Sequence, residues 1–154
     1  MRREKTRATL IIGPETVTKQ FRNPTDADTE ISWYQQLPPG IAPQILHAED
    51  DVLVITKHPP AKPERGPLIQ LLQRLQSLGI HHRDVHPGNI VQGPDGPLLI
   101  DWETAIHATA PSYDLHGPEV SGIPIPAIHQ ALGTGYCMWL HSSHRLSIRN
   151  QWRH

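Results

Sequence analysis

Polar and turn-forming residues are crowded into the segment 81–91, which reads HHRDVHPGNIV. Asp84 lies there on a loop after a helix-like stretch, and Asn89 comes shortly after it. A hairpin then returns the chain, and Asp101 directly follows the apolar run PLLI. Two carboxylates and an amide near one point offer the hard oxygen ligands that hold Mg²⁺ against phosphates. One of the carboxylates is then available to accept a proton from an incoming hydroxyl.

The spacing of these residues resembles the catalytic loop of the protein-kinase-like superfamily. His82, Arg83, Asp84 and Asn89 match its pattern H-R-D-x-x-x-x-N, and Asp101 stands where the superfamily carries the metal-binding Asp of D-F-G. The resemblance implies ATP and Mg²⁺ as cofactors. It also implies that Asn89 and Asp101 are metal ligands and that Asp84 orients or deprotonates the acceptor hydroxyl.

The signals for a subfamily are divided. HPGN at 86–89, DWE at 101–103 and PSYDL at 111–115 are similar to aminoglycoside and choline phosphotransferases. His86 also stands where protein serine/threonine kinases usually carry Lys. The Arg83 of HRD favours protein kinases instead. We therefore favour a protein serine/threonine kinase slightly, with a small-molecule phosphotransferase as the alternative.

The same resemblance calls for a small nucleotide-binding lobe before the catalytic loop. Lys19, in TVTKQF, sits where the superfamily places its strand Lys, and Glu30 lies in the helix-like segment that follows. We expect these two catalytic residues to form an ion pair that holds Lys19 against the α- and β-phosphates of ATP. The residues expected to bind the nucleotide are Lys19, Ile12, Val17, Thr56 and Asp101.

The glycine-rich phosphate loop of kinases has no clear counterpart in the sequence. We expect IIGPET at 11–16, with one Gly and one Pro, to occupy its place. Fewer backbone N–H groups are then available to phosphate. The poor loop and the short chain after Asp101 keep open a third reading, a degenerate kinase fold that acts as a binding module. The presence of Asp84, Asn89 and Asp101 together argues against it.

Hydrophobic patterning and turn residues divide the chain into short elements. Strands are expected in three segments, which are 7–21, 42–58 and 89–103. Helices are expected in two segments, which are 25–37 and 67–79. Thr25 or Asp26 is the expected cap of the first helix, and leucines form one apolar stripe on the second. The pattern weakens after residue 104.

These elements predict an α+β, protein-kinase-like bilobal fold. It is expected to be compact, with a small antiparallel β N-lobe and a shortened helical C-lobe. The stretch PPAKPERG is rich in Pro and divides the two lobes. The expected domains are an N-lobe at 1–58, a hinge or linker at 59–66 and a C-lobe at 67–154. ATP is expected to lie between the lobes.

Composition argues against several other classes of protein. The formal net charge of −1 indicates neither nucleic acid nor an anionic membrane as a partner. The longest apolar runs are far shorter than the ~20 residues that cross a bilayer. The single Cys137 fits a reducing, cytoplasmic location. The clustered histidines lack any C-x-x-C or H-E-x-x-H pattern, so zinc is not expected. The expected partners are ATP and a protein or small-alcohol acceptor.

Overall fold

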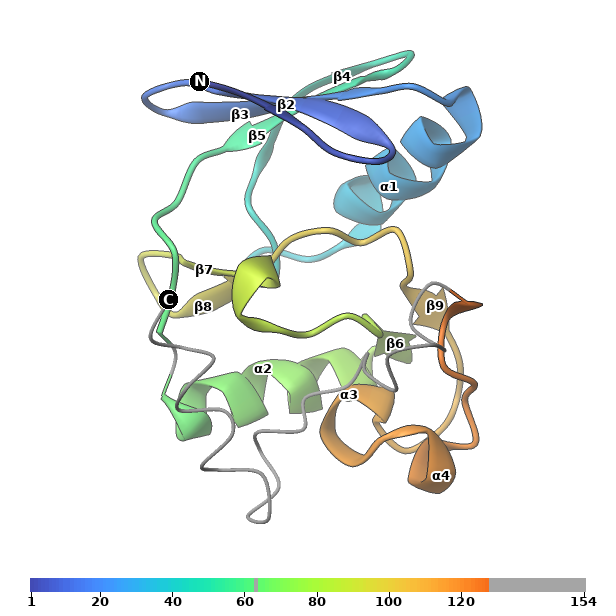
Figure 1. The fold of residues 1–154 in the computed structure, drawn as a ribbon. Coiled ribbons are helices and arrows are strands. Elements are labelled where there is room, and N and C mark those ends of the chain that lie inside the picture. Colours follow the sequence, from blue (N-terminus) through green and yellow to red (C-terminus); the bar gives the residue numbers. More distant parts are fainter. Residues whose placement is uncertain (63, 128–154) are drawn as a thin grey trace.

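An antiparallel sheet with one helix forms the first part of the chain. The computed structural model describes residues 1–62 and 64–127 (Figure 1). The sheet has the strand order β1-β2-β3-β5-β4, with antiparallel neighbours throughout. Its strands are Arg2–Glu4 (β1), Ala8–Ile12 (β2), Thr16–Phe21 (β3), Ile45–Glu49 (β4) and Val52–Thr56 (β5). The strands predicted within 7–21 and 42–58 are therefore confirmed.

Strand β1 has no counterpart among the predicted elements, because its three residues are all charged and exposed. With β1 present, Lys19 lies on the third strand and Lys5-Thr6-Arg7 forms the loop between the first two. The phosphate loop is expected at the turn between the first two strands. IIGPET joins the second strand to the third, so the expectation that it stands in place of this loop is wrong. Gly13 belongs instead to the turn between β2 and β3, where its N–H donates to the Thr16 carbonyl at 2.9 Å.

Helix α1 (Pro24–Gln36) packs against the sheet and begins one residue before its predicted start. Asn23 caps it, rather than Thr25 or Asp26, because the Asn23 side-chain oxygen accepts a hydrogen bond from the Thr25 N–H at 2.8 Å. Pro24 occupies the first turn, where no donor is needed. The buried residues of the helix are Ala27, Glu30, Trp33 and Tyr34. The interior therefore contains a carboxylate.

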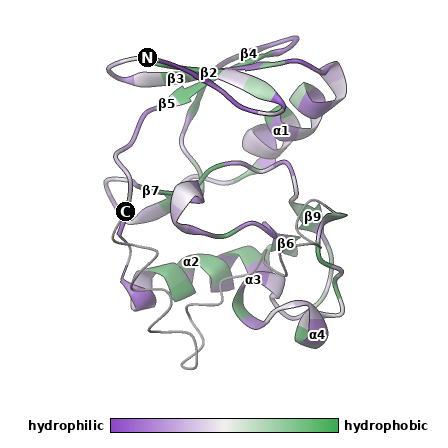
Figure 2. Ribbon diagram, in the orientation of Figure 1, coloured by the Kyte–Doolittle hydropathy of each residue, from purple (hydrophilic) through white to green (hydrophobic). Residues whose placement is uncertain are grey.

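Helix α2 (Arg65–Ser77) follows the linker and carries the predicted leucine stripe. Its buried residues are Leu68, Leu71, Leu72 and Leu75. Figure 2 shows this helix and β5 among the apolar parts of the ribbon. Gly79 follows the helix with φ at +70°, the left-handed conformation that Gly adopts most readily. The helix predicted over 67–79 is thus confirmed, with its start two residues earlier.

Short strands and turns surround the catalytic-loop segment. The strand pairs are β6 (Ile80–His81) with β9 (Ile106–His107) and β7 (Ile90–Gln92) with β8 (Pro97–Leu99). The second pair is the hairpin predicted within 89–103. The short helical turns are η1 (Pro87–Asn89), α3 (Tyr113–His116) and α4 (Pro118–Ser121).

Two backbone hydrogen bonds join the sheet and its helix α1 to the part of the chain that carries α2. In the linker, the Gln92 N–H on β7 donates to the Pro59 carbonyl at 2.8 Å. In the connection between α1 and β4, the Ile41 carbonyl accepts the Leu99 N–H of β8, also at 2.8 Å. Both contacts end on the β7–β8 hairpin, so this hairpin is one of the places where the two parts are joined.

One cluster of buried residues joins the sheet, α1, α2 and the segment around Trp102. The predicted fold class is confirmed: an antiparallel N-terminal sheet and few helices form an α+β, kinase-like arrangement with small lobes. The domain boundaries at 1–58, 59–66 and 67–154 stay predictions. Residues 128–154, including Cys137, lie outside the described residues.

Removing a buried leucine from α2 should destabilise the protein strongly. We expect Leu72→Ala, at a side chain that is 0% exposed, to lower the free energy of unfolding by about 2–5 kcal/mol through lost burial and a cavity. Leu78→Ala is the control, because Leu78 is 43% exposed and its truncation should cost within about 0.5 kcal/mol. Urea denaturation measures both. Equal losses in the two variants would contradict this packing.

Candidate active site

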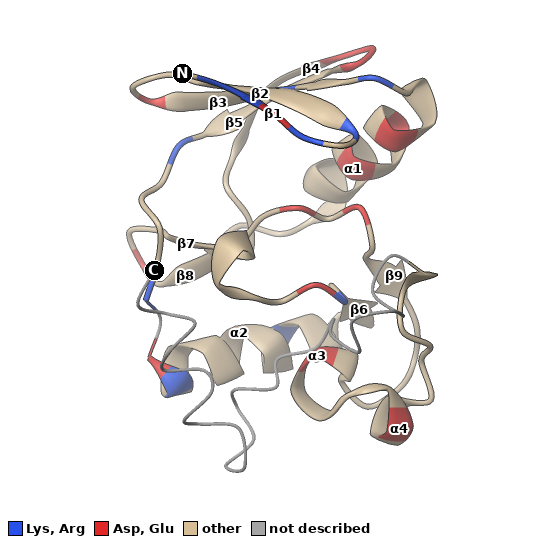
Figure 3. Ribbon diagram, viewed as in Figure 1, with Lys and Arg blue, Asp and Glu red and all other residues tan. Residues whose placement is uncertain are grey.

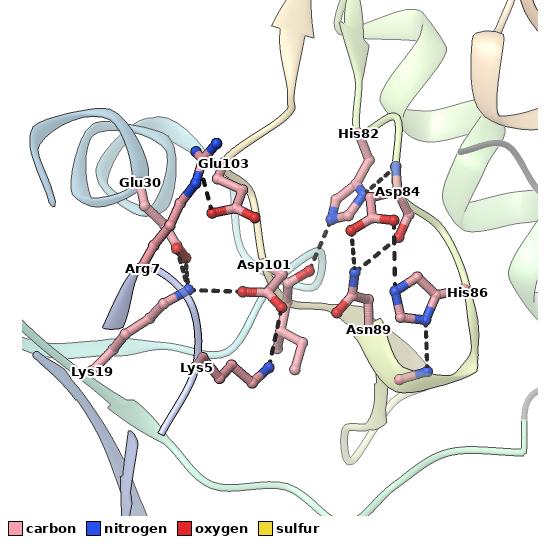
Figure 4. Close-up of polar contacts among 12 residues, drawn as sticks. Lys5, Arg7, Lys19, Glu30, His82, Asp84, His86, Asn89, Asp101 and Glu103 are labelled. Atoms are coloured by element: carbon pink, nitrogen blue, oxygen red, sulfur yellow. Dashed lines mark hydrogen bonds and ion pairs between the residues drawn. The ribbon is translucent and has the colours of Figure 1, made fainter. Parts of the chain in front are cut away.

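Lys19 lies between two carboxylates from different parts of the chain (Figure 4). Its Nζ donates to Glu30 Oε1 at 2.5 Å and Oε2 at 3.0 Å, and to Asp101 Oδ1 at 2.7 Å. Strand β3 supplies the lysine, α1 supplies the glutamate and the turn after β8 supplies the aspartate. The side chains of Lys19 and Glu30 are only 12% and 1% exposed. The structure thus brings together three residues that the sequence assigns to one site.

Burial and charge set the protonation of this cluster. Burial raises the pKa of Glu30 to about 7, and the attraction of Lys19 offsets only part of this effect. Burial also works against the charged form of Lys19, but Glu30 and Asp101 outweigh it and raise the lysine pKa above its ordinary value. For Asp101, burial is likewise outweighed, here by Lys19, and its pKa lies below the ordinary value. Asp101 is therefore ionised at neutral pH, as a metal ligand must be.

Asp101 is held in an uncommon backbone conformation. Its φ is +60°, in the left-handed region, which Asp tolerates better than most residues. The following residue, Trp102, is fully buried, and its indole N–H donates to the Leu99 carbonyl at 2.9 Å. This anchor fixes the turn after β8, so the Asp101 carboxylate is directed toward the sheet.

Asp84 and Asn89 are joined within the catalytic loop. The Asn89 amide donates to the Asp84 backbone carbonyl and to Asp84 Oδ2, both at 2.9 Å. Because the amide hydrogens serve Asp84, the Asn89 oxygen is the atom left to bind a cation. His86 lies on the other side, with Nε2 3.5 Å from Asp84 Oδ1. Its Nδ1 accepts the Gly88 N–H at 3.0 Å, so Nε2 carries the ring proton toward Asp84.

Asp114, in α3, binds the backbone of the loop that carries Asp84. Its carboxylate accepts the backbone N–H groups of His82 at 2.8 Å and Arg83 at 2.9 Å. The His82 ring extends the support, because Nδ1 accepts the Asp84 N–H at 3.1 Å and Nε2 donates to the Ile100 carbonyl at 2.8 Å. One imidazole therefore links the catalytic loop to the residue that precedes the metal-side Asp.

Two of the three apolar or hydroxyl positions predicted to contact the nucleotide lie on the Lys19 face of the sheet. Ile12 and Val17 are cross-strand partners, and Val17 is two residues from Lys19 along β3. Thr56 lies on the opposite face by its register, and its hydroxyl hydrogen-bonds with the His58 ring at 2.9 Å. The structure therefore does not bring the Thr56 side chain to the Lys19 cluster. A nucleotide contact by any of the three stays a prediction.

A cavity of about 1020 Å³ lies away from these charged groups. The connection between α1 and β4, the end of β5, helix α2 and the β7–β8 turn form its walls, and Thr56 and Arg74 are among its lining residues. Its lining includes neither Lys19 nor Asp84 nor Asp101. The candidate active site is therefore defined by its converging side chains and not by this cavity.

Sequence reasoning missed two groups near the site. Asp114 was visible as part of PSYDL, but nothing in the sequence showed that its carboxylate reaches the catalytic-loop backbone. Lys5 gave no signal, because β1 and the loop after it lack any apolar pattern. In the structure, Lys5 Nζ lies 3.6 Å from Asp101 Oδ2.

The donor set suits the Mg²⁺ of a metal–nucleotide complex. Within residues 1–62 and 64–127, no three or more His, Cys, Asp or Glu side chains gather as a metal-binding group. Mg²⁺ in nucleotide sites typically takes one or two protein carboxylates or amides and completes its shell with water and phosphate oxygens. An ionised Asp101 and the oxygen of Asn89 meet that requirement. These two residues would hold the metal together with its phosphates.

The arrangement of a strand lysine, a helix glutamate and an acidic catalytic loop across two small lobes defines a kinase-like phosphotransferase fold. Within that class, the chain belongs to the phosphotransferase enzyme family APH, whose family model matches residues 17–116. The match runs from β3 to α3, so it includes the HRD segment, Asp101 and the supporting Asp114.

The crystal structure of monomeric WbdD is similar to this chain, with a TM-score of 0.54 and 25% sequence identity. The similarity covers 65% of this chain and 33% of that one, so the chain spans about a third of the length of this relative. No curated protein matches the sequence. In the part of the chain that the structure describes, no helix has both the length and the apolar character needed to cross a membrane.

Replacing Glu30 by Gln should change how stability depends on pH. The folded chain keeps the Glu30 proton up to a pKa of about 7, against an ordinary value of 4.5. Raising the pH through this interval therefore costs the wild type stability, since the unfolded chain releases the proton first. Gln has no proton to lose. We expect the Tm of Glu30→Gln to rise relative to wild type between these pH values.

Thermal denaturation at constant ionic strength measures this difference. Glu15→Gln is the matched control, because it removes one exposed acid from the turn between β2 and β3 and leaves the Lys19 cluster intact. A Tm difference between wild type and Glu30→Gln that stays constant from pH 4.5 to pH 7 would show that burial does not govern this carboxyl group.

Proposed function

We propose that the chain transfers the γ-phosphate of MgATP to an alcohol hydroxyl. The Lys19 ammonium, held between Glu30 and Asp101, is the observation that carries this proposal. Phosphoryl transfer requires little covalent chemistry from the protein and depends on positioning and on neutralising phosphate charge. A shielded cation fixed next to a candidate metal ligand serves both needs. Membership in a phosphotransferase family supports the same reaction.

Each reactive group has one role in this proposal. Lys19 binds the α- and β-phosphates, and Glu30 keeps its ammonium group in place. Asn89 and Asp101 hold Mg²⁺, which supplies charge neutralisation at the phosphates when bound. Asp84 orients the acceptor hydroxyl and accepts its proton, while the Asn89 amide fixes the carboxylate.

The acceptor that we favour is a small molecule with a hydroxyl group. The family match supports this choice, and so does His86 at the position next to Asp84 where protein kinases usually carry Lys. Arg83 adds a further reason. Its guanidinium donates to the Thr104 carbonyl at 2.7 Å and to the Pro124 carbonyl at 3.1 Å, so it is engaged with backbone and not displayed to a phosphate group.

A serine or threonine of a protein is the second candidate acceptor. The HRD sequence at 82–84 favours it, and the sequence-based preference for it stays a prediction. The two acceptors require the same nucleotide chemistry and differ only in the group that approaches Asp84. The reaction with the nucleotide and the identity of the acceptor therefore have to be tested by separate measurements.

Nucleotide binding and turnover should respond differently to two substitutions. We expect MgATP to raise the Tm of the wild type and Asp101→Asn to abolish the magnesium-dependent part of that shift. Asp84→Asn should keep the shift but lower turnover of labelled ATP about a hundredfold or more, since it removes the proton acceptor. Asp95→Asn, in the exposed β7–β8 turn, is the control for loss of one acid. No shift at millimolar MgATP would favour the binding-module reading.

The acceptor can be identified by label transfer. Wild type is incubated with γ-labelled MgATP and, separately, with aminoglycosides, choline-like amino alcohols and generic protein acceptors. We expect label on a small alcohol, and about a hundredfold less label or lower in reactions with Asp84→Asn. Label found only on protein serine or threonine would overturn the favoured acceptor while leaving the phosphotransferase assignment intact.

A further inference from the structure

A basic loop reaches the metal-side carboxylate from the sheet. Residues 5–7, Lys5-Thr6-Arg7, connect β1 to β2, and Lys5 Nζ lies 3.6 Å from Asp101 Oδ2. Lys19 occupies the other oxygen, Oδ1, at 2.7 Å. Figure 4 shows the two ammonium groups approaching Asp101, with Lys19 coming from strand β3 and Lys5 from the loop between β1 and β2. Each oxygen of this carboxylate therefore has its own lysine.

The backbone of this loop is fixed while the Lys5 side chain keeps freedom to move. The Arg22 guanidinium donates to the Lys5 carbonyl and to Glu4 Oε2, and the Thr9 hydroxyl donates to Glu4 Oε2 at 2.8 Å. The Lys5 N–H donates to the Ala8 carbonyl at 2.9 Å. The Lys5 side chain itself is 40% exposed, and its four-carbon stem is flexible.

A contribution to folding stability does not explain why Lys5 lies next to Asp101, because an ion pair with such an exposed lysine contributes little to the free energy of unfolding. Phosphate binding does explain it. The loop between the first two strands contains no Gly, and the Lys5 N–H is already bonded, so the glycine-lined backbone cradle of other kinases is missing here. Figure 3 shows basic positions on β1 and on the loop after it. Two of them are paired with the turn after β8, because Lys5 Nζ lies 3.6 Å from Asp101 Oδ2 and an Arg7 guanidinium nitrogen lies 3.8 Å from Glu103 Oε2.

We propose that Lys5 binds the terminal phosphates of the nucleotide in place of a glycine-rich loop. The inference rests on the function proposed above. When MgATP binds, the Lys5 ammonium leaves Asp101 Oδ2, an oxygen suited to the metal, and contacts phosphate oxygens. Lys19 stays with Glu30 and the inner phosphates. The matched family segment begins at residue 17, so Lys5 lies outside it.

Isothermal titration of the full chain with MgATP and with adenosine tests the role of Lys5. We expect Lys5→Met to weaken MgATP binding about ten- to a hundredfold, the loss typical of one charge-assisted hydrogen bond, and to leave adenosine binding unchanged. Lys5→Arg keeps the charge and should recover most of the affinity. Arg3→Met removes a neighbouring exposed charge on β1 and should bind MgATP like wild type.

The outcomes separate this inference from the function on which it rests. If wild type binds MgATP and Lys5→Met binds it within twofold of wild type, the role of Lys5 is overturned and the phosphotransferase proposal stands. Equal losses for MgATP and adenosine would also overturn it, because they indicate a structural effect. Lys5→Gln, with its own Tm measured, replaces Lys5→Met if that variant is unfolded. A wild type that binds no MgATP overturns both proposals.

Discussion

The position of one ammonium group, that of Lys19, organises the whole site. It is the point where the sheet, helix α1 and the turn after β8 meet, because Glu30 and Asp101 both bind it. A shielded cation needs compensation, and two carboxylates supply it. The register of β3 against its neighbours, the capped start of α1 and the left-handed turn at Asp101 all serve to keep these three groups together.

A second layer of contacts fixes the backbone and the acidic side chain of the loop that carries Asp84. Asp114 binds two consecutive N–H groups of that loop, and the His82 ring bridges it to Ile100, the residue before Asp101. The Asn89 amide then sets the Asp84 carboxylate. The loop thus has its geometry determined by buried polar contacts, which hold position more strictly than apolar packing does.

Short-range patterns in the sequence predicted most of this structure, and long-range geometry had to come from coordinates. The HRD and DWE residues have fixed spacing, so the sequence assigns Asp84, Asn89 and Asp101 to one site, and the structure joins Asp84 to Asn89 through a side-chain hydrogen bond. Strand β1 was not foreseen, because three exposed charged residues carry no periodic signal. The error about the phosphate loop followed from that omission. The face on which Thr56 lies depends on cross-strand register, which a single strand does not reveal.

The two backbone hydrogen bonds to the β7–β8 hairpin tie the sheet part closely to the rest of the chain. Pro59 is bonded to Gln92 and Ile41 is bonded to Leu99, so both crossings between the lobes are held to the same hairpin. Lys57, two residues before Pro59, is bonded instead to Glu15 in the sheet. Only His58 therefore separates the last linker residue bonded to the sheet from the first one bonded to the hairpin. The second connection, between α1 and β4, is bonded to the hairpin at Ile41. A displacement of the sheet relative to this hairpin would therefore have to be taken up by very few residues, and a larger one would break one of these backbone hydrogen bonds.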